Sequence, residues 1–73
     1  MAKKATAAVY RVVDVVGTSP DSWEDAARNA VKTASRSLRD LRIAEVVKLD
    51  VKVDNGKVTA FRTRLALSFK YES

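Results

Sequence analysis

An α+β fold in the order strand, helix, strand, strand is predicted by three features of the chain. β-branched residues dominate residues 9–16, an apolar stripe at helical spacing runs through residues 20–41, and apolar and polar residues alternate over residues 43–53 and 57–71. The helix returns the chain, so the first and second strands run in the same direction, and the third pairs antiparallel with both. The result is a three-stranded antiparallel sheet in the order 1-3-2, packed on one helix.

The length of the chain allows one small domain, which we expect over residues 8–73, after a flexible N-terminal tail over residues 1–7. A chain of this size buries only about 60% of its unfolded surface, so a single copy is marginally stable. The sequence has no cysteine, and a disulfide therefore cannot add stability. Self-association is the remaining source of stability, and we expect it.

The connection between the first strand and the helix carries two alternative helix starts. The run Gly17-Thr18-Ser19-Pro20 is expected to end the strand, with Ser19 as the N-cap and Pro20 in the first helical position, where an N–H is not needed. Ser22 and Asp25 offer a second capping box, three residues further on. Trp23 lies on the apolar stripe of the helix and is predicted to be a core residue.

The second and third strands are joined by a hairpin turn at Asp54-Asn55-Gly56, because Asn and Gly tolerate positive φ. We expect strict alternation along the second strand. One face then carries Glu45, Val47, Leu49, Val51 and Val53, and the other carries Ala44, Val46, Lys48, Asp50 and Lys52.

The sheet face away from the helix is expected to be open and basic. Asp50 lies among its basic residues, and Arg11 joins them if its side of the first strand faces this way. Three interpretations stay open for this face: a solvated surface, a surface for anionic ligands or phosphates, and a nucleic-acid surface. Nucleic acid is disfavoured, because no aromatic residues are interleaved with the charges. The basic residues are Lys48, Lys52, Arg62, Arg64 and Lys70.

Composition disfavours several classes of function. Fourteen basic residues against nine acidic ones give a net charge of +5, which suits anionic partners. The chain has no histidine or cysteine, so it lacks an imidazole base and the usual ligands of zinc, and no nucleophile–base pair is apparent. We therefore expect no enzymatic activity. No apolar run is long enough to span a membrane, and we expect a cytoplasmic protein with no membrane partner.

An acidic cluster of Asp21, Glu24 and Asp25 lies at the start of the predicted helix. Helix capping explains these residues, since the helix dipole favours anions there. The same carboxylates could instead bind Ca²⁺ or Mg²⁺, which need several oxygen ligands. One chain supplies too few ligands, so copies meeting at a symmetry axis would have to supply the rest.

The chain resembles the dodecin family over about residues 8–72. The resemblance is carried by Val15-Val16-Gly17-Thr18-Ser19, Ser22-Trp23-Glu24-Asp25-Ala26-Ala27, Ala44-Glu45-Val46-Val47 and Leu67-Ser68-Phe69-Lys70-Tyr71. It implies a βαββ subunit, and an assembly of twelve copies in a hollow shell with the helices outside and the sheets facing inward.

Most dodecins bind flavins, with a tryptophan for stacking and a glutamine for the polar edge of the ring. Here Ile43 stands where the tryptophan is expected, and Arg62 where the glutamine is expected. The chain is thus similar to a dodecin-like branch without this pair, linked with calcium and sometimes given a secretion-translocase name. The resemblance implies a non-enzymatic homododecamer that stores a small ligand or ion. Calcium or another divalent cation is favoured as the cargo, with Asp21 and Glu24 as candidate metal residues. The alternative is a dodecin that stores riboflavin or FMN.

Overall fold

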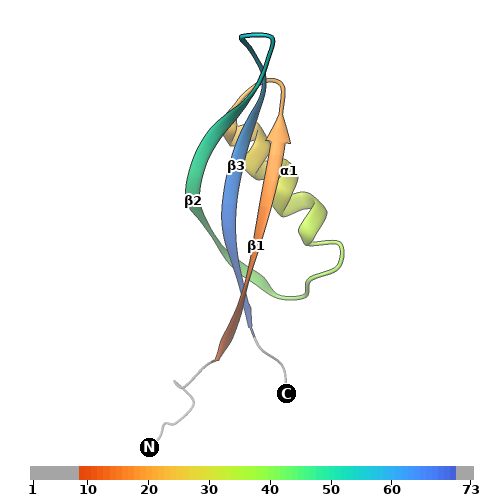
Figure 1. Cartoon of the computed structure of the whole chain (residues 1–73). Coiled ribbons are helices and arrows are strands. Elements are labelled where there is room, and N and C mark those ends of the chain that lie inside the picture. The colour runs from red at the N-terminus through yellow and green to blue at the C-terminus, as the bar shows by residue number, and fades with distance from the viewer. Residues whose placement is uncertain (1–8, 71–73) are drawn as a thin grey trace, which may run out of the picture.

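The computed structural model describes residues 9–70, which form one helix packed on one face of a three-stranded antiparallel sheet (Figure 1). The elements are β1 (Tyr10–Ser19), α1 (Trp23–Ala34), β2 (Leu41–Asp54) and β3 (Lys57–Lys70). The sheet order β1-β3-β2 confirms the predicted topology. The expected tail over residues 1–7, and the end of the third predicted strand at Tyr71, lie outside the described residues.

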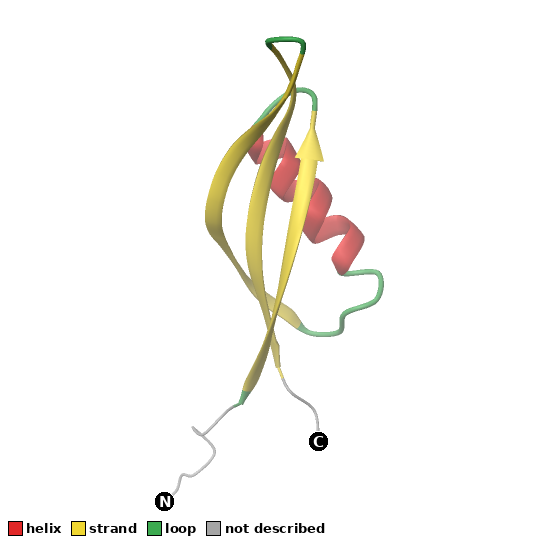
Figure 2. Cartoon of the chain, in the orientation of Figure 1, coloured by secondary structure: helices red, strands yellow, loops and turns green. Residues whose placement is uncertain are grey.

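The connection between β2 and β3 is the predicted hairpin. Asp54 pairs with Lys57, and the two residues between them have positive φ, 51° at Asn55 and 75° at Gly56. This is the geometry of a two-residue type I′ turn, whose twist matches that of the strands it joins. Figure 2 shows this tight turn and the longer loop after α1 in green.

β1 continues through Gly17, Thr18 and Ser19, so the prediction that these residues end the strand is wrong. Gly17 pairs with Thr63, and Ser19 pairs with Phe61. The glycine is needed here because α1 crosses directly over it. A Cβ at this position would overlap the carbonyl oxygen of Ala26 and lie 2.8 Å from the Cβ of Ala30.

The helix begins at Trp23 with Ser22 as its N-cap, so the start at Ser19 and Pro20 is wrong and the alternative at Ser22 is confirmed. The Oγ of Ser22 accepts a hydrogen bond from the backbone N–H of Asp25, at 3.0 Å. The carboxylate of Asp25 does not complete the box. It accepts instead from the hydroxyl of Ser19, at 2.7 Å, which ties the helix start to the end of β1.

The helix ends at Ala34, seven residues before the predicted end at residue 41. The chain then turns, reaches φ 54° at Asp40 and enters β2 at Leu41. Leu38 and Leu41 still pack against the core, although neither is helical. The apolar spacing of the sequence therefore predicted their burial correctly and their backbone conformation wrongly.

The core lies between α1 and the β1–β3 pair. Its buried apolar residues are small on the helix, where they are Ala26 and Ala30, and large on the sheet, where they are Leu65 and Leu67. Ala30 packs with both leucines. Trp23 is only partly buried, with 37% of its surface exposed, so its predicted place in the core is wrong. Its ring packs edge-on against Phe61, with centroids 5.1 Å apart.

The faces of β1 follow from its pairing with β3. Val15 lies opposite buried Leu65 and Gly17 opposite buried Thr63, so both point toward the helix. Arg11 has the same parity, and its guanidinium lies 5.9 Å from the centroid of the Phe69 ring. Arg11 therefore lies on the helix side of the sheet and does not join the basic residues of the opposite face.

Strict alternation along β2 is wrong, because the strand contains a β-bulge at Val47. Val46 pairs with Leu65, whereas Lys48 pairs with Arg64, which leaves one extra residue between them. Residues on the two sides of the bulge therefore exchange faces. Ala44 and Val46 point toward the helix like Leu49 and Val51, while Lys48, Asp50 and Lys52 share the opposite face with Glu45.

The helix leaves much of β2 uncovered on its own side of the sheet. Val46, Leu49 and Val53 remain about half exposed. At the other edge of the sheet, the side-chain amide of Asn29 donates to the carbonyl of Thr18 at 3.1 Å, so α1 occupies part of the β1 edge. Within residues 9–70, no helix is long and apolar enough to cross a bilayer.

Substitution of Gly17 by alanine is expected to destabilise the fold by about 1–3 kcal/mol, because the added methyl group overpacks the contact with α1. Urea unfolding at constant protein concentration measures the loss. The control is Gly56→Asn, at a turn where a Cβ meets no neighbour and asparagine tolerates positive φ. An equal loss in both variants would contradict the close packing at Gly17.

Candidate functional site

The sheet surface opposite α1, here called the open face, is the candidate site. Figure 1 views the sheet from this side, with α1 behind it. Cross-strand partners share a face, so the register assigns the residues of each strand. The open face carries Tyr10, Val12, Asp14, Val16 and Thr18 from β1, Ile43, Glu45, Lys48, Asp50 and Lys52 from β2, and Arg62, Arg64, Ala66, Ser68 and Lys70 from β3.

The open face is divided into a basic end near the hairpin and a more apolar end. Four of the five predicted basic residues gather at the hairpin end: Lys48, Lys52, Arg62 and Arg64. Lys70 lies six residues beyond Arg64 on β3, about 20 Å away along the strand.

At the apolar end, Val12 and Ile43 flank Ser68 in one row across the sheet. In the next row, Asp14 and Glu45 flank Ala66 and separate the two ends of the face.

Arg62 and Asp50 form a two-bond ion pair at the basic end. The Nε of Arg62 donates to one carboxylate oxygen of Asp50 at 2.7 Å, and an Nη donates to the other at 3.2 Å. The hydrogen bond from Arg62 lowers the pKa of Asp50, and Lys48 and Arg64 add smaller electrostatic contributions in the same direction. The same hydrogen bond raises the pKa of Arg62. The charge of Arg62 is thus largely balanced within the chain.

A small hollow lies beside this ion pair. It has a volume of about 140 Å³ and is lined by Val16, Lys48, Asp50, Arg62 and Arg64. All three strands contribute to it, because β3 lies in the middle of the sheet. The open face therefore has a concave, positively charged site within a single chain.

The predicted metal residues Asp21 and Glu24 lie elsewhere, in the turn before α1 and in its first turn. Both are exposed, whereas Asp25 is held by the hydroxyl of Ser19. That hydroxyl also accepts from the backbone N–H of Asp21, at 2.9 Å. No three acidic residues among positions 9–70 come close enough together to hold a metal ion. A cation site at Asp21 and Glu24 stays a prediction that requires ligands from further copies of the chain.

Known proteins are similar to this chain in sequence and in fold. A calcium dodecin from Mycobacterium tuberculosis is 51% identical over 63 residues, which are 85% of this chain and 87% of that protein. The dodecin family model matches residues 9–72. The chain belongs to the dodecin family. This membership confirms the resemblance that the sequence carries.

Solved dodecin structures have the same fold. The dodecin of Streptomyces coelicolor superposes with a TM-score of 0.85 at 42% identity, over 90% of this chain and 94% of that one. The crystal structure of the calcium dodecin from M. tuberculosis, described as having a novel calcium-binding site, gives a TM-score of 0.78 at 48% identity. That match covers 88% of this chain and 91% of the other.

The two positions that the dodecin resemblance associates with flavin lie far apart within one chain. Ile43 pairs with Ser68 and is 61% exposed at the apolar end of the open face. Arg62 is six residues from Ser68 on β3, about 20 Å along the strand, and is engaged by Asp50. A ligand of flavin size that touched both positions would have to lie between copies of the chain.

The sequence analysis did not predict that Arg62 pairs with Asp50, or that Val16 lines the hollow. Counting outward from the Asn55-Gly56 turn places Asp50 opposite Phe61, one residue away from its true partner. The register shift between Lys52 and Val53 corrects this, and no residue type in that stretch marks the shift. The only available signal was the opposite charge of the two side chains.

The Asp50–Arg62 pair predicts a specific acid dependence of stability. The pKa of Asp50 is lowered from its ordinary value of 3.8 by Arg62, so the pair stabilises the fold above about that pH. The contribution is lost as the pH falls below 3.8 toward the lower pKa of the folded state. Asp50→Asn is therefore expected to flatten the fall of the urea midpoint over this acidic range.

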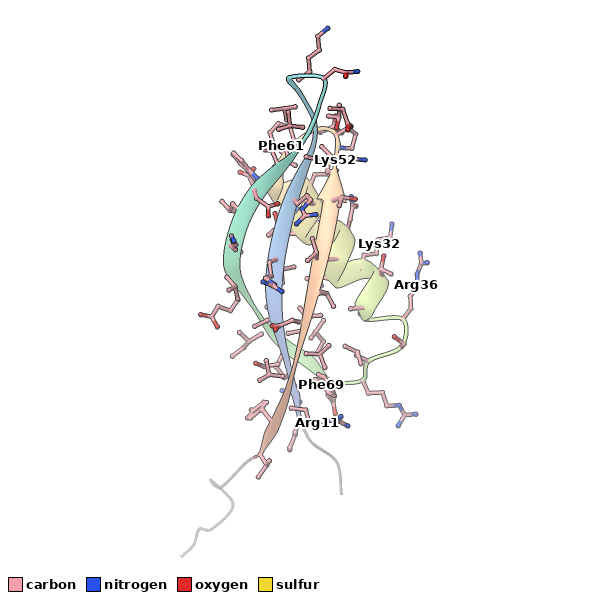
Figure 3. The ribbon with its side chains drawn as sticks, viewed as in Figure 1. Arg11, Lys32, Arg36, Lys52, Phe61 and Phe69 are labelled. Carbon is pink, nitrogen blue, oxygen red and sulfur yellow. The ribbon has the colours of Figure 1, made fainter. Side chains whose placement is uncertain are left out.

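Arg62→Gln should flatten the same part of the profile, since it removes the other partner. Arg36→Gln is the control, because it removes an equal charge from the loop after α1 (Figure 3). A profile for Asp50→Asn that matches the unaltered chain would show that the ion pair does not form in solution.

Proposed function

We propose that this dodecin is a non-enzymatic subunit of a hollow homododecamer that stores a divalent cation, calcium, rather than a flavin. The observation that carries the proposal is the 51% identity to a protein named calcium dodecin, over most of both chains. The sequence contributes a second argument, because a catalytic nucleophile–base pair is not apparent in it. The cytoplasmic location expected from the sequence stays part of this proposal.

Self-association is supported by the apolar surface that one chain leaves exposed. On the helix side, Val46, Leu49 and Val53 of β2 are only half covered. On the open face, Val12 and Ile43 are each 61% exposed. Exposed apolar area of this extent at a sheet edge favours pairing with further copies, and twelve is the number implied by the family resemblance.

The calcium proposal requires assembly. Calcium takes six to eight oxygen ligands, and Asp21 and Glu24 of one chain supply at most four carboxylate oxygens. Both side chains are exposed beside the N-terminus of α1, which is positive and opposes a cation. Equivalent carboxylates that converge at a symmetry axis would overcome this opposition and complete the ligand set.

Flavin storage is the alternative for a member of this family. It is less well supported, because Ile43 offers no aromatic face for stacking, which contributes about 1–3 kcal/mol per base in nucleic-acid complexes. Arg62 is also held by Asp50 and would have to leave its ion pair to contact the ring edge.

The purified chain is expected to assemble into twelve copies, because a monomer of this size leaves β2 largely uncovered. Native mass spectrometry at micromolar concentration measures the number of subunits. Val46→Asp places a charge on the exposed helix-side surface of β2 and should shift the population toward smaller species. A stable monomer of the unaltered chain would contradict the assembly.

Calcium titration of the chelator-treated protein should show saturable binding in a calorimeter, and the combined variant Asp21→Asn, Glu24→Gln should lose it. The control is Asp14→Asn, Glu45→Gln, which removes the same charge from the open face. Binding that survives in the first variant would place the site elsewhere. Absence of binding at millimolar calcium, together with quenching of added riboflavin fluorescence, would favour the flavin alternative.

A further inference from the structure

Lys48 and Arg64 face each other directly on neighbouring strands of the open face. They are cross-strand partners, so their Cβ atoms lie about 4.5–5.5 Å apart. Like charges in this position destabilise a sheet. Neither side chain has an ion pair with any acidic residue among positions 9–70, and both are exposed. Within the described part of the chain, the charge of Asp50 offsets this cost only in part, because it makes its hydrogen bonds with Arg62.

The carboxylate that lines the hollow beside Lys48 and Arg64 already has a partner. Asp50 binds Arg62 through both of its oxygens, at 2.7 and 3.2 Å. The hollow is therefore lined by three cationic side chains and one carboxylate, which leaves a net charge of +2. An anion that entered the hollow would meet the unpaired charges of Lys48 and Arg64 without breaking the existing ion pair.

We propose that this hollow is an anion site that binds phosphate, held between Lys48 and Arg64. A guanidinium presents a planar fork of N–H donors that matches two phosphate oxygens, and a lysine ammonium contributes a mobile point charge. A phosphate dianion balances the net charge of the hollow. The volume of about 140 Å³ admits such a group with some of its water, since a water molecule occupies about 30 Å³ of liquid.

The shape of the site favours a small phosphate ligand over a nucleic acid strand. The hollow is lined by Val16 and charged side chains, with no aromatic residue on which a base could stack. Tyr10 is the only aromatic residue that the register places on the open face, and it lies opposite Lys70 at the far end of the sheet.

The anion site goes beyond the proposed storage of calcium and does not depend on it. A hollow of positive charge repels a free divalent cation, so the two sites are separate on the chain. Metal-free protein is therefore the correct material for the test. A failure to bind phosphate under these conditions leaves the calcium proposal untouched, and a failure to bind calcium leaves the anion site untouched.

Calorimetric titration with inorganic phosphate, at an ionic strength fixed with sodium chloride, tests the site. The unaltered chain should bind phosphate, and Arg64→Gln and Lys48→Gln should each weaken binding about tenfold or more, because each removes a charge-assisted hydrogen bond. Arg36→Gln and Lys32→Gln are the matched controls. Both residues lie on the helix side of the molecule, away from the open face (Figure 3), and both variants should bind as the unaltered chain does.

Thermal unfolding supplies a second measurement that does not require tight binding. Phosphate should raise the Tm of the unaltered chain more than an equal ionic strength of sodium chloride, and this difference should disappear in Arg64→Gln. If phosphate and chloride raised the Tm of the unaltered chain equally, the effect of phosphate would be general ionic screening, and the proposal would be overturned. Phosphate binding that Arg64→Gln and Lys48→Gln leave unchanged would also overturn it.

A comparison of ligands identifies the source of the phosphate. Glycerol phosphate carries the same group as a monoester and is titrated beside inorganic phosphate. Tighter binding of the monoester, lost in Arg64→Gln, would support a phosphorylated small molecule as the ligand. Tighter binding of inorganic phosphate, lost in the same variant, would support the free ion.

Discussion

The close approach of α1 to β1 at Gly17 is the constraint on which the rest of the structure depends. The helix presents Ala26 and Ala30 to a strand position without a side chain, so the two backbones come nearly into contact. This brings the helix near enough for Leu65 and Leu67 of the central strand to be fully buried beneath it. A larger residue at any of the three small positions would lift the helix and open the core on both strands.

Polar contacts near this packing fix the start of the helix to the sheet. The hydroxyl of Thr63, itself buried, donates to the carbonyl of Trp23 at 2.9 Å. The indole N–H of Trp23 donates in turn to the carbonyl of Asp50 at 3.0 Å. Because the side chain of Asp50 binds Arg62, one residue of β2 connects the helix with the basic end of the open face. The charged surface is therefore held by the same contacts that anchor the helix.

The topology was predictable because each element has a strong local signal. Alternation predicted the strands of the hairpin, Asn55 and Gly56 predicted its turn, and the return of the chain through one helix fixed the strand order. The ends of the helix were not predictable in the same way. Leu38 and Leu41 continue its apolar spacing, yet they reach the core from a loop and a strand.

The candidate site could be predicted only in part. The basic residues of β3 follow simple alternation, so Arg62 and Arg64 were placed correctly on one face. Their partners on β2 depend on bulges, and a bulge at Val47 has no residue type that reveals it. The sequence alone therefore predicts a basic face but not which charges are paired and which are left unpaired.

The β2–β3 ladder has three register shifts, and the two that flank the segment from Lys48 to Lys52 have opposite senses, which limits how the hairpin can change length. Val47 is the extra residue on β2, and Thr59 is the extra residue on β3, so the intervening segment from Lys48 to Lys52 is displaced by one position and then restored. Removal of Val47 or of Thr59 makes the ladder continuous at that position, with the neighbouring side chains on their present faces, and leaves the other shifts in place. A deletion inside the segment would instead move the residues between it and one of the two bulges by one position, and each of the moved side chains would turn to the opposite face. Single-residue length changes in this hairpin should therefore be tolerated during evolution at the two bulges and removed by selection between them.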